Sequence, residues 1–252
     1  MRGSVRYLIG IRNVLIIAFL GLMFFTLVSG SYISRRDTSD DISDNTVIAP
    51  EPNPVPPDSP PKHLVGDFVL LGGVNWRVLD ISEEKALVLS EDILFDMAYH
   101  DIRRGAPWEE SSARRYLNND FYEMFFTDEE KLLIVPSRVE NARNRWTLAE
   151  GNEDTIDRIF LLSLDEVLHY FSDGDFHEYE YRDYIGYLTD DHDSLRVAKH
   201  NGRPSWWWLR TAGTHHYAAA GIYGNGAIGV GGALASYEKG YGIRPAMWIL
   251  NN

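Results

Sequence analysis

The sequence predicts one α+β domain with antiparallel strands at both ends and helices between them, preceded by a transmembrane helix and a Pro-rich linker. Three observations predict this organisation. Short strand-like runs occur between residues 68 and 90 and again after Trp206, helical spacing of apolar residues occurs between them, and an uncharged apolar run lies near the N-terminus. We place the segment boundaries at 1–34, 35–63 and 64–252.

The first segment, residues 1–34, carries a membrane signal. Arg2, Arg6 and Arg12 precede residues 13–34, which contain no charged side chain. This order is typical of a signal anchor or of a cleaved secretory signal. A helix over residues 7–29 is long enough to enter a bilayer, and the preceding arginines favour a cytoplasmic N-terminus. We therefore expect a single-pass protein of the cell membrane with an extracytoplasmic C-terminal domain; secretion after cleavage near Gly30 is the alternative.

The second segment, residues 35–63, has the composition of a disordered linker. Its first part is acidic, from Asp37 to Asp44, and seven of the eleven prolines of the chain lie between Pro50 and Pro61. Because proline has no N–H group and a fixed φ, this stretch cannot enter a helix interior or a central strand. An extended spacer between membrane and domain is expected.

Charge and cysteine content exclude several classes of function. The chain has 24 Lys and Arg residues against 37 Asp and Glu residues, a formal net charge of −13, so we expect no nucleic-acid partner. It has no cysteine, which excludes disulfides, thiolate metal sites and cysteine nucleophiles.

Strands are expected first within residues 64–252. The runs 68–71, 75–81 and 86–90 are rich in β-branched and apolar residues, and Gly72-Gly73 and residues 82–85 separate them. These runs predict an antiparallel meander.

Helices are expected next. Ser111 or Ser112 could cap a helix whose apolar residues recur at helical spacing through Phe121. Residues 127–130 and 163–166 have the pattern of capping boxes.

The domain is expected to end in strands. The turn Gly224-Asn225-Gly226 predicts a hairpin, and residues 243–250 predict a closing strand. Pro245 would confine that strand to a sheet edge or a bulge.

Several sequence blocks, in order, resemble the bacterial family catalogued as domain of unknown function 6273. The blocks are Gly73–Leu79, Ala86–Ser90, Trp108–Ser111, Arg114–Phe121, Ile159–Ser163 followed by Glu166, Trp207–Arg210 and Gly242–Ile249. The resemblance covers residues 64–252, although Thr211-Ala212-Gly213 stands where the family usually has Ser-Pro-Gly. The family's Gly-rich ending is distantly similar to formylglycine-generating enzymes and other C-type-lectin-like folds. That similarity implies a C-type-lectin-like domain in which the first and last strands pair, placing residues 68–71 beside residues 244–249.

The candidate ligand-binding residues all lie in the C-terminal part of the domain: Trp206, Trp207, Trp208, Arg210, His215, His216, Tyr223, Asn225 and Arg244. Alternation on a strand places Trp206 and Trp208 on one side and Trp207 on the other. One side could form a stacking platform for a sugar or peptide, and packing of all three in the core is the competing interpretation. Arg210 and Arg244 could hold an anion or pair with carboxylates of the framework.

No metal site or cofactor is expected. His215 and His216 are adjacent, so on an extended segment they point apart and form a poor ligand pair. The acidic runs 173–175 and 190–193 could bind calcium but lack the spacing of an EF-hand loop, which favours solvated loops. A Ser nucleophile in a Gly-x-Ser-x-Gly sequence is absent.

These observations favour a non-catalytic, membrane-anchored extracytoplasmic module that binds a glycan, a cell-wall fragment or a protein ligand. Two alternatives remain open. The first is an extracytoplasmic enzyme, distantly related to formylglycine-generating enzymes but without their cysteines, in which His215 or His216 works with an acidic residue. The second is a structural or assembly domain without a small ligand.

Overall fold

The computed structural model describes residues 62–101, 107–147, 149–181, 184–215 and 217–251. They belong to the second of the two units into which contacts divide the chain, Pro54–Asn252. This unit is a mixed α+β structure, mostly strands in two sheets with a few short helices, as predicted. The predicted membrane segment and the linker through residue 61 lie outside the described residues. Among the described helices, none combines the length and apolar character needed to cross a bilayer.

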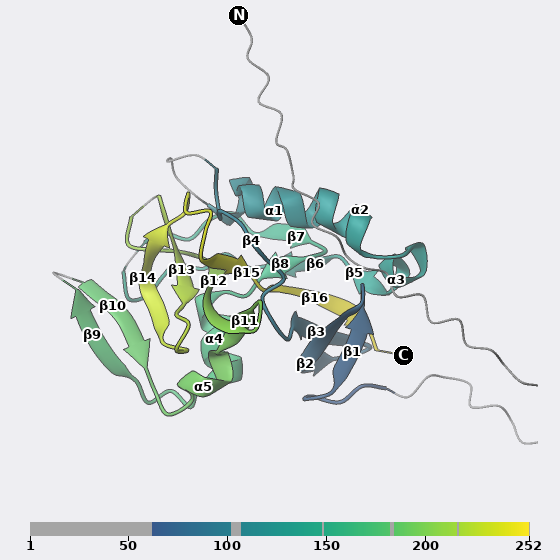
Figure 1. Cartoon of the computed structure of the whole chain (residues 1–252), viewed down its shortest axis with the longest axis horizontal. Helices are drawn as coiled ribbons and strands as arrows, with labels where there is room; N and C mark the ends of the chain where they lie inside the picture. Colours follow the sequence, from purple (N-terminus) through teal and green to yellow (C-terminus); the bar gives the residue numbers. More distant parts are fainter. Residues whose placement is uncertain (1–61, 102–106, 148, 182–183, 216, 252) are drawn as a thin grey trace, which may run out of the picture. The chain divides into compact units, whose positions relative to one another are not determined.

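The first sheet contains strands from both ends of the domain. Its order is β1-β2-β3-β16-β5, and β8 also pairs with β16. Strands β1, β2 and β3 lie at the right of Figure 1. The bounds are β1 (Phe68–Leu71), β2 (Val74–Ser82), β3 (Lys85–Ser90), β5 (Ile134–Val135), β8 (Phe160–Leu161) and β16 (Pro245–Leu250).

The predicted meander of β1, β2 and β3 is confirmed, and both of its pairings are antiparallel. Gly72 and Gly73 form the first turn with φ values of 58° and 72°, a left-handed conformation that favours glycine. A Cβ atom added to Gly72 would lie 2.3 Å from Cε1 of Phe125, whereas one added to Gly73 would have nothing within 4 Å. Gly72 therefore allows β1 to turn directly beneath a helix.

The closing strand β16 lies inside the first sheet, so the expected edge position is wrong. β16 pairs with β3 on one side and with β5 and β8 on the other. Pro245 fits because it is the first residue of the strand and the ladder with β3 begins only at Ala246. The expected pairing of first and last strands is also wrong, since β2 and β3 separate β1 from β16.

The second sheet has the order β4-β15-β12-β13-β14-β10-β9, with β11 paired to β12. Strands β9, β10, β13 and β14 lie at the left of Figure 1. Its pairings are antiparallel except for that of β12 with β15, which is parallel. The bounds are β4 (Phe95–Asp96), β9 (His177–Tyr181), β10 (Tyr184–Thr189), β11 (Ala198–His200), β12 (Arg203–Ala212), β13 (Ala218–Ile222), β14 (Ile228–Leu234) and β15 (Tyr241–Ile243).

The predicted hairpin around residues 224–226 is confirmed as the connection of β13 to β14. The Tyr223 N–H donates to the Ala227 carbonyl and the Gly226 N–H donates back to the Tyr223 carbonyl. Gly226 has a φ of 92°. This turn carries Tyr223 and Asn225, two of the residues singled out from the sequence.

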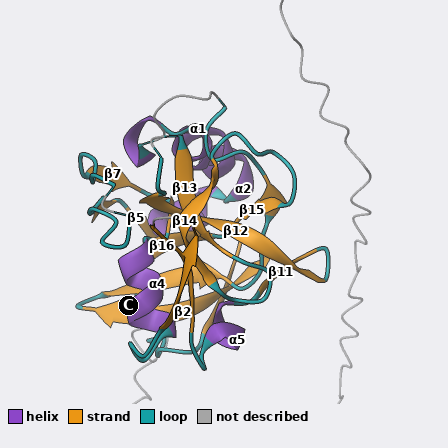
Figure 2. Ribbon diagram, turned by 90° about the vertical axis from the view of Figure 1, so that its left-hand side faces the viewer, coloured by secondary structure: helices purple, strands orange, loops and turns teal. Residues whose placement is uncertain are grey.

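Three of the helices begin where the sequence placed their caps. Ser111 accepts a hydrogen bond from the Arg114 N–H, and both expected capping boxes, at Thr127 and Ser163, are formed. Helices α1 and α2 lie along the upper edge of the domain in both views, and α4 and α5 lie in the lower half (Figures 1 and 2). The bounds are η1 (Trp108–Glu110), α1 (Ser112–Tyr116), η2 (Leu117–Phe121), α2 (Tyr122–Phe125), α3 (Asp128–Leu133), α4 (Leu164–Phe171) and α5 (Asp193–Arg196); β6 (Ser137–Val139) and β7 (Thr155–Asp157) form a separate two-stranded ribbon.

Candidate functional site

The three consecutive tryptophans of β12 have different environments. Trp207 and Trp208 are 0% and 1% exposed, so neither can serve as a stacking platform. The Trp207 indole N–H donates to the Arg196 carbonyl at 3.1 Å, and that of Trp208 donates to the Met97 carbonyl at 2.9 Å. The platform interpretation is therefore wrong for these two residues. Only Trp206 is partly exposed.

Trp206 belongs to a continuous series of six aromatic side chains on the second sheet, which we call the aromatic row. In order of contact, its members are Tyr179, Tyr187, Tyr223, Trp206, Tyr241 and Tyr237. The centroids of successive rings lie 4.6, 5.9, 3.7, 5.1 and 5.3 Å apart. Aromatic rings at such separations attract one another, so each ring helps to hold the orientation of the next.

The register of the second sheet places these rings side by side. Tyr179 of β9 lies opposite Tyr187 of β10, and their rings are stacked with planes 7° apart. Trp206 of β12 lies beside Tyr241 of β15 in the parallel pair. Cross-strand partners share a face of the sheet, so each pair presents two neighbouring rings. Tyr223, just after β13, contacts both pairs and joins them into one row.

A glycine in β14 makes room for the central ring. A Cβ atom added to Gly229 would lie 2.9 Å from Cε2 of Tyr223 and 3.2 Å from the Gly221 carbonyl oxygen. The Tyr223 ring therefore lies close to bare backbone at this position. Any larger side chain at Gly229 would push that ring away.

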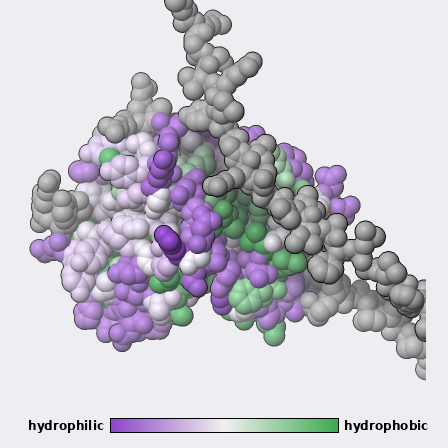
Figure 3. All heavy atoms as spheres, in the orientation of Figure 1, coloured by the Kyte–Doolittle hydropathy of each residue, from purple (hydrophilic) through white to green (hydrophobic). Residues whose placement is uncertain are grey.

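The aromatic row is accessible to a ligand. Tyr179, Tyr187 and Tyr237 expose 43%, 36% and 42% of their surface, and the three rings between Tyr187 and Tyr237 are half-buried. In Figure 3 the left part of the domain, where β9, β10 and β14 lie, is mostly hydrophilic or neutral, whereas hydrophobic residues gather towards the right. The row therefore offers three exposed and three half-buried rings to a ligand.

A charged pair near the Tyr241 end of the second sheet does not belong to the row. Asp96 of β4 lies opposite Gly242 and not Tyr241, so strand alternation directs it to the other face, where its carboxylate pairs with Nδ1 of His200 at 3.0 Å. Burial, together with neighbouring Tyr237, raises the pKa of the Tyr241 hydroxyl, which stays protonated at neutral pH. Aromatic faces with hydroxyl groups at their edges can bind a ligand that has both apolar faces and polar edges.

Asn225 lies near this surface but is not a member of the row. It is exposed in the β13–β14 turn, and its side-chain oxygen accepts the Ala227 N–H at 3.2 Å. This bond closes the turn locally.

Arg210 belongs to the framework. Its guanidinium donates to both carboxylate oxygens of Glu166, at 2.5 and 2.9 Å, and to the backbone carbonyls of Glu140 and Leu161. Glu166 is also the residue that closes the Ser163 capping box. The ion pair therefore fixes the start of α4 against β12, and the structure favours the framework interpretation over an anion site.

His215 is exposed and packs its ring 5.2 Å from that of Tyr217, and His216 lies outside the described residues. Among the described residues, no ion pair joins His215 to a carboxylate. The acid–base pair on which the enzyme hypothesis depends is therefore not assembled by the part of the chain that can be described.

The two acidic runs meet in space. Oxygen or nitrogen atoms of Asp173, Asp190 and His192 lie within 4.8 Å of one another. However, both carboxylate oxygens of Asp190 already accept hydrogen bonds, from Arg196, Ser172 and the His192 N–H. A metal ion would have to displace these bonds, so the cluster is better described as an ion-pair network. The expectation of a solvated loop is wrong for Asp190, which is buried.

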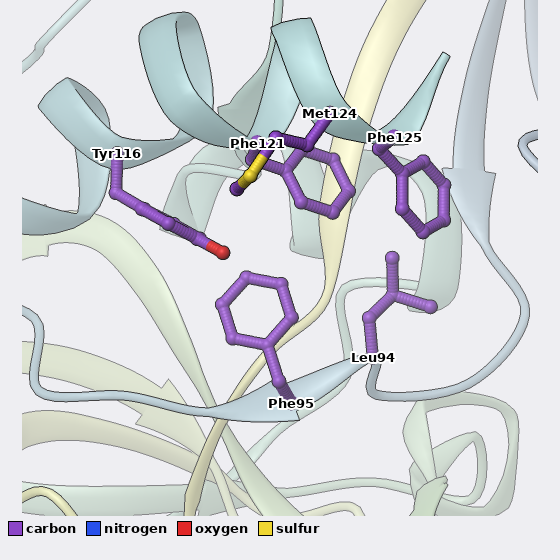
Figure 4. Close-up of a pocket in the computed structure, with 6 residues that line it drawn as sticks. All are labelled: Leu94, Phe95, Tyr116, Phe121, Met124 and Phe125. Atoms are coloured by element: carbon purple, nitrogen blue, oxygen red, sulfur yellow. The ribbon is translucent and has the colours of Figure 1, made fainter. Parts of the chain in front are cut away.

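A separate pocket of about 210 Å³ lies between the α1–α2 helical segment and the chain around β4. Figure 4 shows aromatic and aliphatic side chains converging on it, with the Tyr116 hydroxyl as the one polar group among the residues drawn. The lining residues are Leu94, Phe95, Tyr116, Phe121, Met124 and Phe125. With so few polar groups to orient a ligand, this pocket is a weaker candidate than the row.

Four of the six members of the row are not among the candidate residues identified from the sequence. Tyr179, Tyr187, Tyr237 and Tyr241 lie in separate strands and loops, and only strand pairing brings them together. The alternation in His177-Glu178-Tyr179-Glu180-Tyr181 was an available signal, because it predicts tyrosines on one face of a strand.

Comparison with known proteins identifies the family. The model of a family described as a domain of unknown function (DUF6273) matches residues 83–251. The chain belongs to this family. The match begins after the first resembling block, Gly73–Leu79. No curated protein and no solved structure matches the chain. The expected likeness of this DUF6273 domain to C-type lectins and formylglycine-generating enzymes therefore has no support from these comparisons.

Proposed function

We propose that this DUF6273 domain is a non-catalytic binding module and that the aromatic row binds a glycan. The observation that carries the proposal is the row itself, six rings in succession with an exposed tyrosine pair at one end and an exposed tyrosine at the other. A pyranose ring has an apolar C–H face and a rim of hydroxyl groups. Tyr and Trp offer a matching combination of an apolar face and a polar edge.

A glycan fits this surface better than a protein ligand does. The core of a protein interface is depleted in charge and uses Met, Phe and Arg anchors beside Tyr and Trp. Exposed aliphatic side chains lie on other elements: Leu64, Val65 and Leu70 in or near β1, Met124 in α2, Leu132 and Leu133 in α3, Ile156 in β7 and Leu195 in α5. The row itself carries groups that hydrogen-bond hydroxyls, namely the hydroxyl groups of its five tyrosines and the indole N–H of Trp206.

The test is a glycan-binding measurement on the purified full-length chain and two matched variants. Tyr187→Ala removes a ring from the row, and Phe68→Ala removes an exposed ring on the first sheet; the two residues are 36% and 49% exposed. Loss of a stacking ring costs about 0.5–1.5 kcal/mol beyond the lost contact area, so we expect binding about tenfold weaker for Tyr187→Ala. Phe68→Ala should bind like the wild type. Failure of every glycan and wall fragment in a broad panel, or equal behaviour of the two variants, would contradict the proposal.

We also propose that residues 7–29 anchor the chain in the cell membrane with the domain on the extracytoplasmic side, where glycans and cell-wall fragments are found. The basic N-terminus, the uncharged run and the Pro-rich linker support this topology. Protease added to intact cells should degrade the domain, and the membrane fraction should retain the N-terminal segment. A chain found wholly in the medium would instead favour signal cleavage.

A further inference from the structure

Arg244 is a buried cation whose hydrogen bonds are incomplete. It lies between β15 and β16 and is 3% exposed. Its Nε atom donates to the Ser90 carbonyl at 3.0 Å and its Nη2 atom donates to the Glu91 carbonyl at 3.0 Å. The third guanidinium nitrogen, Nη1, is buried and has no hydrogen-bond partner among the described residues.

An unmet donor on a buried cation is unusual. Buried polar groups in folded proteins are almost always hydrogen-bonded, since leaving one unpaired costs free energy. The Arg244 guanidinium lies 5.0 Å from the centroid of the Trp207 ring. This cation–π contact partly compensates for the loss of hydration, but the ring does not accept a conventional hydrogen bond. The side chain therefore retains one N–H group that is not used by the described residues.

Arg244 lines a cleft of about 360 Å³. The walls come from β2, the residue after β3, and helices α4 and α5; they include Arg77, Val78, Glu91, Phe171 and Leu195. The cleft therefore combines two guanidinium groups with apolar side chains.

The second arginine of the cleft is already neutralised. Arg77 forms a bidentate ion pair with Glu91: its Nε atom donates to Oε2 at 2.8 Å and its Nη2 atom donates to Oε1 at 2.5 Å. Only Arg244 therefore brings a positive charge without a carboxylate partner. Burial lowers the pKa of Arg244 to about 10, so the group remains charged at neutral pH.

We propose that this cleft binds a carboxylate carried on a small apolar group and that the buried Arg244 Nη1 becomes its principal hydrogen-bond donor when the neighbouring side chains shift to admit the ligand. A guanidinium is the side chain best matched to a carboxylate, and the bond gains strength where water is excluded. The apolar walls formed by Val78, Phe171 and Leu195 would hold the rest of the ligand. A dianionic phosphate fits less well because Glu91 forms part of the wall and one unpaired nitrogen supplies too few donors.

The carboxyl end of a peptide and a short-chain fatty acid share this chemistry. The probes are N-acetylalanine for the first source and butyrate for the second. N-acetylalaninamide is the neutral control, and inorganic phosphate tests the competing anion. Binding to the full-length chain is followed by ligand-observed NMR, which detects weak complexes. Because only the acid can accept a hydrogen bond between two charged groups, N-acetylalanine should bind about tenfold more tightly than N-acetylalaninamide.

One matched pair of variants and one conservative variant separate this site from a general effect of charge. Leu195→Glu places a negative charge at the mouth of the cleft, and Leu132→Glu places the same charge on another exposed leucine, in α3. Leu195→Glu should weaken carboxylate binding several-fold, and Leu132→Glu should leave it unchanged. Arg244→Lys keeps the charge but removes the fork, and should weaken binding as well if the variant folds.

Three results would overturn the proposal. They are equal binding of acid and amide, equal binding by the two glutamate variants, and tighter binding of phosphate than of either carboxylate. If only one of the two acids binds, the shared chemistry stands and the source is identified. Glycan binding by the aromatic row does not enter this test, so the two proposals can fail separately.

Discussion

The ion-pair network around Arg196 predicts a large and specific loss of stability in Asp190→Asn. Arg196 is 0% exposed and donates to both carboxylate oxygens of Asp190, at 2.6 and 3.1 Å. It also donates to the Gly226 carbonyl in the β13–β14 turn and to the Phe171 carbonyl at the end of α4. Removing one partner of a buried ion pair costs about 3–5 kcal/mol. Asp193 still contacts the guanidinium, so we expect the lower end, about 3 kcal/mol.

The pH dependence has a definite sign. Burial alone would raise the pKa of Asp190, but hydrogen bonds from Arg196 and Ser172 outweigh it and lower the pKa below its ordinary value. A carboxyl with a lowered folded-state pKa stabilises the fold above the unfolded-state pKa, about 3.9, and loses that contribution as the pH falls through the folded-state pKa. The wild type should therefore lose this stability in acid, whereas Asp190→Asn should lack this part of the pH dependence.

The assay is urea unfolding of the purified chain followed by tryptophan fluorescence, because Trp207 is buried and bonded to Arg196. The matched control is Asp191→Asn, which makes the same change of charge at an exposed neighbour and should alter the free energy of unfolding by less than about 0.5 kcal/mol. The reasoning is refuted if Asp190→Asn loses no more stability than Asp191→Asn does. It is also refuted if the acid sensitivity of the two variants is the same.

Two further predictions concern glycines. Gly72→Ala should destabilise the domain by about 1–3 kcal/mol more than Gly73→Ala, because both positions have left-handed φ values but only a Cβ atom at residue 72 would clash with Phe125. Thermal unfolding of the two variants measures this difference. Equal losses of stability would show that the Phe125 ring can move aside. Gly229→Ala should displace the Tyr223 ring and weaken glycan binding several-fold; unchanged affinity would mean that the centre of the aromatic row does not contact the ligand.

The elements that the sequence predicted well are those fixed by neighbouring residues. A capping box needs only the four residues from Thr127 to Glu130, and the turn at Gly72-Gly73 needs only two glycines. These signals lie within one turn of chain, so no knowledge of the rest of the fold was needed. The α+β class followed from the same local evidence.

The predictions that were wrong concern tertiary structure: which side chains pack on a residue and which strands lie on either side of a strand. Alternation correctly assigned Trp207 and Trp208 to opposite sides of β12. It could not show that Arg244 and Arg196 lie beside Trp207. Nor could it show that Tyr99 and Tyr241 pack on Trp208. The central place of β16 likewise depends on partners more than 80 residues away in sequence, such as Leu161 and Leu89. Such long-range pairings leave no mark in a local pattern.

The alternation of β12 also explains why the two proposed sites can act independently. Trp206 and Trp208 both contact Tyr241, so they lie on the side of the aromatic row. Trp207 points the other way, where its ring lies beneath the Arg244 guanidinium. One strand therefore carries the proposed glycan surface on one face and backs the proposed carboxylate cleft on the other, and the Trp207 hydrogen bond to Arg196 fixes the strand between them. Because the two surfaces share a strand but no side chain, a ligand in the cleft need not displace a glycan on the row.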